Sequence, residues 1–244
     1  MKVMSLSLLA VALAATAQVH GATVTIDNTT ECTLSQYLTS TGKSIETGDD
    51  VVFAGSAAVT VTTELSGLTG TITVRNGATL IAANSAALGT ADGETWVESG
   101  GQLTLTSTTK AGTVLWDETL HLAGTIRSEE PKASRPDWSH SIYPHKWILE
   151  GDAIVSSLNE QNDLIGIEFD QQGRYQLTIQ TIWQYTQMSG CTLTNPYCLL
   201  LKGYGGVVMG GYTKLNGDST CLLKIDEGAG LWGYYWGDTS EGES

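Results

Sequence analysis

A stretch of the chain repeats its own pattern of apolar and glycine residues about every 23 positions. An apolar residue is followed three positions later by glycine or alanine, and a second apolar residue follows after three more. The copies are Val74/Gly77/Leu80, Val97/Gly100/Leu103, Leu120/Ala123/Ile126 and Ile148/Gly151/Ile154. Coils of a chain that stack about 4.8 Å apart need side chains of similar size at equivalent positions. The repeat therefore predicts a β-solenoid.

Residues between the glycines alternate between apolar and polar, as in 71–74 and 103–106. This period of two, with many β-branched residues, predicts strands. We expect Val74, Val97 and Leu120 to form one buried column. The glycines at the corners should provide the positive φ that a sharp turn needs; they are Gly77, Gly100 and Gly228.

A β-sandwich is the alternative fold for such a strand-rich chain. It predicts tight turns between antiparallel strands, for which Asn-Gly and Asp-Gly are the preferred sequences. Such pairs are present at 76–77, 92–93 and 216–217. The common spacing of apolar and glycine positions favours the solenoid over the sandwich.

The two ends differ from the body of the chain. Residues 1–17 combine Lys2, an apolar run and the small residues Ala15 and Ala17, which is the pattern of a secretory signal peptide. We therefore expect export to the periplasm, the cell surface or the medium, with no transmembrane segment in the mature chain. Residues 237–244 are a polar acidic tail, either the natural end of a free protein or the end of a fragment.

The charge balance narrows the classes of partner. Without Lys2, 11 basic residues face 26 acidic ones, which gives a net charge of about −15. Such a chain repels phosphate backbones, and no basic stripe is present, so we expect no nucleic-acid partner.

The segment before the repeats carries a resemblance to a known group. Residues 32–38, Cys-Thr-Leu-Ser-Gln-Tyr-Leu, precede Gly-Asp-Asp-Val-Val-Phe at 48–53 and Thr-Ile-Thr-Val at 71–74. This resembles the N-terminal entry of right-handed parallel β-helix surface proteins, although Ser35, Gln36 and Tyr37 replace the usual Arg-Glu-Ala. The later repeats resemble passenger domains of autotransporters and polymorphic outer-membrane proteins.

The resemblance implies an all-β, right-handed, single-stranded parallel β-helix of the pectin-lyase-like kind. We expect an N-terminal cap over residues 18–50 and the β-helix over 51–236. The cap should contain a short helix with Leu34, Tyr37 and Leu38 on one face, which covers the open end of the first coil.

One segment interrupts the repeat and is our first candidate for ligand binding. Residues 128–146 hold three of the four prolines. Insertions in solenoids project from one face and often bind partners. The candidate ligand-binding residues are Arg135, Asp137, Trp138, His140 and Tyr143. No metal or cofactor site is predicted, because the spacing of His140 and His145 matches no established metal site.

A second cluster is aromatic, and Trp232, Tyr234 and Trp236 can share one strand face. These rings suit either stacking on sugars or a cap over the last coil, and we favour the cap. Four cysteines in an exported chain permit disulfides. Cys191 and Cys198 flank a turn-forming Asn-Pro pair, and we expect them to bond to each other.

Two functions fit these observations. The first is a non-catalytic, adhesin-like passenger or scaffold whose partners are glycans or other cell-surface molecules. The second is a polysaccharide-acting β-helix enzyme, either a lyase or a glycoside hydrolase. Such an enzyme needs clustered acids and a base, and we identify no catalytic residues, so we favour the first.

Overall fold

The computed structural model describes most of the chain from residue 21 to residue 234. The described ranges are 21–83, 85–106, 114–115, 118–129, 140–143, 146–157, 162–165, 168–171, 175–181, 185–189, 192–194, 198–203, 206–210, 214–216, 223–225 and 230–234. Side chains are described for 21–83, 87–106, 118–127, 146–156 and 175–180. The predicted signal peptide, the tail and Gly228 lie outside these ranges.

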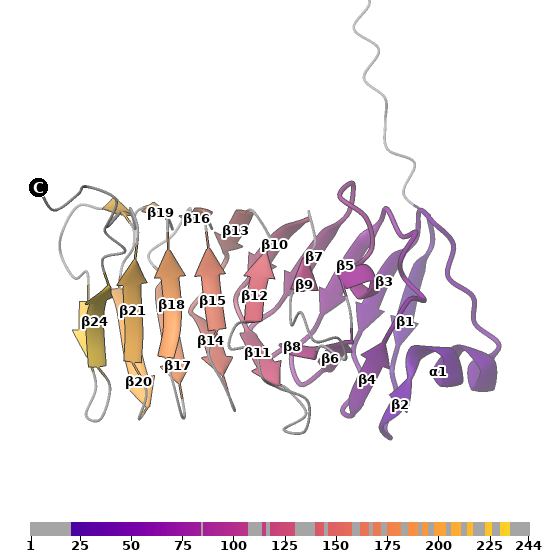
Figure 1. Ribbon diagram of the computed structural model, residues 1–244. Helices are drawn as coiled ribbons and strands as arrows, with labels where there is room; N and C mark the ends of the chain where they lie inside the picture. Colours follow the sequence, from indigo (N-terminus) through magenta and orange to yellow (C-terminus); the bar gives the residue numbers. More distant parts are fainter. Residues whose placement is uncertain are drawn as a thin grey trace, which may run out of the picture.

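The described strands form three sheets that run along one stack of coils (Figure 1). Sheet one has the order β1 (Thr23–Ile26), β3 (Asp50–Phe53), β5 (Thr71–Val74), β7 (Glu94–Val97), β10 (Thr119–Leu122), β13 (Lys146–Leu149), β16 (Glu168–Gln171), β19 (Thr192–Thr194) and β22 (Lys214–Asn216). Sheet two has the order β2 (Cys32–Thr33), β4 (Ala58–Val61), β6 (Thr79–Ala82), β8 (Gln102–Thr106), β11 (Thr125–Glu129), β14 (Ala153–Ser157), β17 (Gln176–Thr181), β20 (Cys198–Gly203) and β23 (Leu223–Ile225).

Sheet three begins later in the chain. Its strands are β9 (Val114–Leu115), β12 (His140–Tyr143), β15 (Asn162–Ile165), β18 (Tyr185–Ser189), β21 (Gly206–Gly210) and β24 (Gly230–Tyr234). Before β9, the third side contains turns and the short 3-10 helix η1 (Ser85–Leu88), and Leu65, Leu68 and Leu88 point into the core there.

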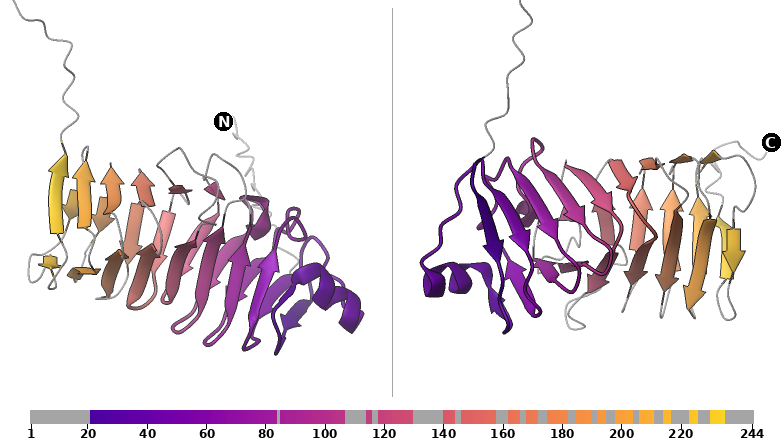
Figure 2. Two further views of the ribbon diagram at one scale, coloured as in Figure 1. Left: turned by 60° about the horizontal axis from the view of Figure 1, so that its bottom comes forward. Right: turned by 180° about the vertical axis from the view of Figure 1, so that it is seen from behind.

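Every strand pair between neighbouring coils is parallel. Figure 2 shows the coils stacked along one axis, with the helix α1 (Leu34–Thr41) at one end and β24 at the other. The predicted parallel β-solenoid is therefore confirmed. The β-sandwich alternative is wrong, because it needs antiparallel hairpins.

Equivalent residues of successive coils form buried columns inside the solenoid. One column of sheet one is paired in register through Ile26, Phe53, Val74, Val97, Leu122 and Leu149. Each of these side chains is buried. Alternate residues along the same strands face outward, which explains the period of two. Gly77 and Gly100 follow this column at a corner and have φ values of 80° and 79°, as predicted.

The predicted column was wrong at its third member. Leu120 pairs with Thr95, and Leu122 is the residue that pairs with Val97. The reason is a shorter corner: six positions separate Val97 from Leu103, whereas four separate Leu122 from Ile126. At this step the spacing of 23 residues is kept in sheet two, from Leu103 to Ile126, and becomes 25 in sheet one, from Val97 to Leu122.

The copy at residues 148–154 was also misplaced by one position. Leu149 and Val155 are the buried residues of that coil. Ile148 is half-buried on the outer side, and Ile154 is 36% exposed. Ile148 is followed by Leu149, and Ile154 by Val155, so the sequence did not show which residue of each apolar pair points inward.

The predicted capping helix is confirmed as α1. Thr33 and Gln36 form a reciprocal capping box at its start, and Gly42 ends it in the left-handed conformation. Leu34 and Tyr37 are buried against the first coil. Strands β1 and β2, within the segment predicted as the cap, already begin sheets one and two.

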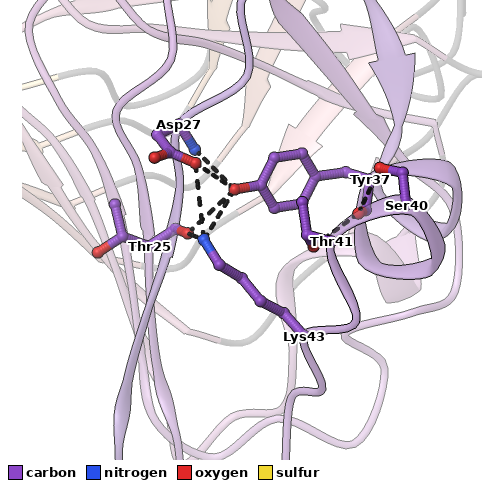
Figure 3. Close-up of polar contacts among 6 residues, drawn as sticks. All are labelled: Thr25, Asp27, Tyr37, Ser40, Thr41 and Lys43. Carbon is purple, nitrogen blue, oxygen red and sulfur yellow. Dashed lines mark hydrogen bonds and ion pairs between the residues drawn. The ribbon is translucent and has the colours of Figure 1, made fainter.

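Tyr37 and Lys43 connect α1 and the segment after it to β1, the edge strand of sheet one (Figure 3). Lys43 Nζ donates to the Thr25 carbonyl at 2.6 Å and to the Tyr37 hydroxyl at 2.8 Å. The Tyr37 hydroxyl accepts from the Asp27 backbone N–H at 3.2 Å and donates to the Asp27 carboxylate. The Tyr37 hydrogen bond and the Lys43 charge lower the pKa of Asp27. These side chains form hydrogen bonds with backbone groups at the edge strand β1. Backbone groups that are already paired cannot pair with another chain.

We expect Tyr37→Phe to destabilise the fold by about 1–3 kcal/mol, because it removes several hydrogen bonds and leaves partly buried groups unpaired. Urea unfolding followed by circular dichroism measures this change. The control is Thr39→Ala on the exposed side of α1, which should change stability by less than about 0.5 kcal/mol. Equal urea midpoints for wild type and Tyr37→Phe would show that these contacts do not contribute to the stability of the fold.

Candidate functional site

A cluster of one histidine, one tryptophan and two glutamates lies on the outer face of sheet one. On β7, Thr95 and Val97 point inward and are buried, so Glu94 and Trp96 face outward. On β10, His121 faces outward between two buried leucines. Because β7 and β10 pair in register, His121 lies directly beside Trp96. The alternation of each strand and the pairing of the two strands together place these residues.

The rings of Trp96 and His121 stack on each other. Their centroids are 3.6 Å apart, and their planes differ by 4°. Outward neighbours on parallel strands stack readily, because the strands are about 4.8 Å apart. His121 is only 8% exposed, whereas Trp96 is half-buried.

Two carboxylates flank the imidazole ring of His121. Glu150, which follows β13, has Oε1 at 2.8 Å from Nδ1. Glu94 Oε2 lies 3.6 Å from Nε2 and accepts from Trp96 Nε1 at 3.3 Å. A carboxylate can only accept hydrogen bonds, so Nδ1 carries the hydrogen and donates a hydrogen bond to Glu150 Oε1. Among the described residues, Nε2 has no hydrogen-bond partner.

The two carboxylates of this cluster are arranged differently from the catalytic pair of a glycoside hydrolase. In glycoside hydrolases, two carboxylates face each other across the space that the sugar occupies. Here the buried imidazole ring fills the space between Glu94 and Glu150. The cluster instead presents two partly exposed carboxylates beside the half-buried Trp96.

A second ionisable group lies inside the solenoid. Glu118, just before β10, is 2% exposed, and its Oε2 accepts from the Thr95 hydroxyl at 2.7 Å. Thr95 lies between Ile72 and Leu120 in a second inward column, and this hydrogen bond explains why a polar residue is found there. Burial raises the pKa of Glu118 to about 8, the nearby charge of Glu94 also raises it, and the Thr95 hydrogen bond opposes the change.

Glycines make the space that the Glu118 carboxylate occupies. A Cβ atom at Gly89 would lie 2.8 Å from Oε1, and one at Gly93 would lie 3.6 Å from Cδ. Oε1 itself and the nearby Thr90 hydroxyl have no hydrogen-bond partner within the described part of the chain. Glu118 is therefore an acid held in a niche that stabilises its neutral form.

The predicted ligand-binding residues are only partly described. Arg135, Asp137 and Trp138 lie outside the described residues. The backbone of His140 and Tyr143 belongs to β12, which pairs with β9 and β15. The interrupting segment 128–146 thus also supplies the end of β11, the whole of β12 and the first residue of β13.

The predicted aromatic cluster lies in the last described strand. Trp232 and Tyr234 belong to β24, which pairs with β21 of sheet three, and Trp236 lies outside the described residues. Neither stacking on sugars nor a capping role is tested by this placement.

Sequence reasoning missed the cluster around His121 and the buried Glu118. Trp96 and His121 are 25 residues apart, so the 23-residue repeat did not align them. One signal was present: each occupies the outward position before the last residue of an alternating strand. Glu118 had no comparable signal.

Two further findings concern the described residues alone. No group of three or more His, Cys, Asp or Glu residues is arranged to hold a metal ion there. No helix in these ranges has the length and apolar character needed to cross a bilayer.

The predicted disulfide remains a prediction, because Cys191 lies outside the described residues while the backbone of Cys198 begins β20. Cys32 is half-buried and free. Mapping of non-reduced peptides by mass spectrometry should find Cys191 joined to Cys198. A peptide that joins Cys191 to any other cysteine would contradict this pairing.

Comparisons with protein-family models, with curated proteins and with solved structures find no match to this chain. The class that the fold itself defines is the parallel β-solenoid.

Proposed function

We propose that the chain is a secreted or cell-surface β-solenoid that acts by binding, as an adhesin-like passenger or scaffold. Glycans or other cell-surface molecules are its partners. The signal-peptide pattern and the resemblance to right-handed, pectin-lyase-like β-helix passenger domains support this proposal.

The filled interior of the solenoid is the observation that carries the proposal. In the coils whose side chains are described, mostly apolar side chains fill the inward columns, so a ligand must contact the outer faces or the departures from the repeat. The outer face of sheet one offers Trp96 with Glu94 and Glu150, and aromatic rings beside polar groups suit sugar recognition. The segment 128–146 runs from the end of β11 to the first residue of β13. In the sequence it therefore lies between His121, on β10, and Glu150, which follows β13. We therefore assign recognition to this part of the solenoid.

A glycan array, together with an assay for released reducing sugar, tests the proposal on the purified exported chain. We expect binding without release of sugar. Binding of no glycan and no cell surface would contradict the proposal. Release of reducing sugar would instead support the polysaccharide-acting enzyme.

Three single substitutions locate the surface. Trp96→Ala and Trp138→Ala should each weaken binding at least tenfold, because stacking rings dominate such contacts. Trp232→Ala, in the predicted cap, is the control and should bind as the wild type does. Substitutions are preferable to removal of the whole segment, because β12 pairs with both β9 and β15. Loss of binding in Trp232→Ala alone would move the surface to the C-terminal rings.

A further inference from the structure

We propose that His121 and Glu94 bind a divalent transition-metal ion on the outer face of sheet one, with Zn²⁺ as the best match. The direct ligands are His121 Nε2 and the Glu94 carboxylate. Glu150 acts as a positioning residue through Nδ1. This proposal stands on the geometry of the cluster and does not depend on the proposed function.

The buried nitrogen of His121 is the first argument. Nε2 is inaccessible to solvent, and no group in the described part of the chain forms a hydrogen bond with it. Buried polar atoms are nearly always paired, and the exceptions commonly mark a missing water or ion. An imidazole nitrogen without a proton is a base with a free lone pair.

The orientation of the ring is the second argument. In a neutral imidazole, the Glu150 carboxylate 2.8 Å from Nδ1 keeps the hydrogen on that nitrogen, so that the lone pair of Nε2 is free to bind a metal ion. Metal-binding histidines almost always donate their other N–H to a carboxylate, a carbonyl or water in this way. The stack with Trp96 fixes the plane of the same ring.

The position of Glu94 is the third argument. Zinc bonds to histidine nitrogen and carboxylate oxygen are both close to 2.0–2.2 Å, so two tetrahedral ligands lie about 3.4 Å apart. The observed separation of Nε2 and Glu94 Oε2 is 3.6 Å. The Glu94 side chain is 52% exposed, so it can move to admit the ion, whose remaining positions would then face the solvent beside Glu94.

The donor set decides the class of metal. An imidazole with one carboxylate suits zinc and its neighbours in the first transition row, whereas calcium and magnesium prefer oxygen ligands alone. Two protein ligands make an open site, weaker than a structural zinc centre with four. Its remaining positions would be filled by water or by oxygen donors of a bound partner.

Titration calorimetry of the full chain with Zn²⁺ tests the proposal. We expect one ion per chain at this site and at least tenfold weaker binding in Glu94→Gln. The matched control is Glu98→Gln, which neutralises an exposed glutamate immediately after the same strand and should leave the affinity unchanged. Absence of Zn²⁺ binding, or equal affinities of Glu94→Gln and Glu98→Gln, would overturn the site.

The positioning role of Glu150 has its own readout. Glu150→Ala should weaken Zn²⁺ binding about tenfold, as the loss of such an outer carboxylate does elsewhere. Glu150→Gln keeps an oxygen that accepts from Nδ1–H, so it should restore most of the affinity. Equal weakening in both variants would show that Glu150 does not act by orienting the ring.

Discussion

Val97→Asp is expected to abolish cooperative folding of the solenoid. Val97 is buried between Val74 and Leu122, with apolar side chains on both sides along the column. An aspartate there buries a charge with no partner, or else keeps its proton and leaves a carboxyl group unpaired. The expected loss is about 4 kcal/mol or more, a large fraction of the stability of an ordinary domain. Thermal unfolding followed by circular dichroism measures it.

Thr73→Asp is the matched control for this substitution. Thr73 is half-buried and faces outward on β5, next to the inward Val74. The same chemical change should therefore cost less than about 1 kcal/mol, since the new carboxylate keeps its water. A Val97→Asp chain that unfolds like the wild type would contradict the register of the coils.

The interior of the solenoid could be predicted because stacking makes the sequence repeat itself. Val74 and Val97 must be similar in size, since one lies directly on the other. The prediction failed at Leu120, where the corner before Ile126 is two residues shorter. Corner length changes from coil to coil, and the repeat contains no rule for it. Columns are thus predictable only as far as the corners stay constant.

The site on the outer face depends on register across three coils. His121 meets Trp96 from the preceding coil and Glu150 from the following one, and 29 residues separate His121 from Glu150. These contacts follow from the lengths of the loops between strands, which the alternation within one strand does not encode. Outward residues also need not match in size from coil to coil as the inward columns do, so no recurring pattern identifies them. The sequence therefore predicted the scaffold better than the site.

Glu118→Gln is expected to make stability less dependent on pH. The pKa of Glu118 is about 8 in the folded chain and about 4.5 in a solvated reference, so the unfolded chain loses this proton first as pH rises. Stability from this group is complete below pH 4.5 and falls by about 1.4 kcal/mol per pH unit until pH 8. The total loss is about 5 kcal/mol. A glutamine is neutral throughout and does not contribute this loss.

Urea unfolding of both chains between pH 4 and pH 9 measures the effect as a difference. Stability of Glu118→Gln relative to wild type should rise steadily from pH 4.5 to pH 8 and stay constant outside that window. The stability difference can also contain a part that is the same at every pH, which reports how well the amide fits the niche beside Thr95 and Gly89. This constant part does not change the slope of the difference against pH. Glu98→Gln, an exposed glutamate, controls for the change in net charge and should show almost no slope. If the two variants follow the same curve, then Glu118 is ionised in the folded chain, and the niche does not favour its neutral form.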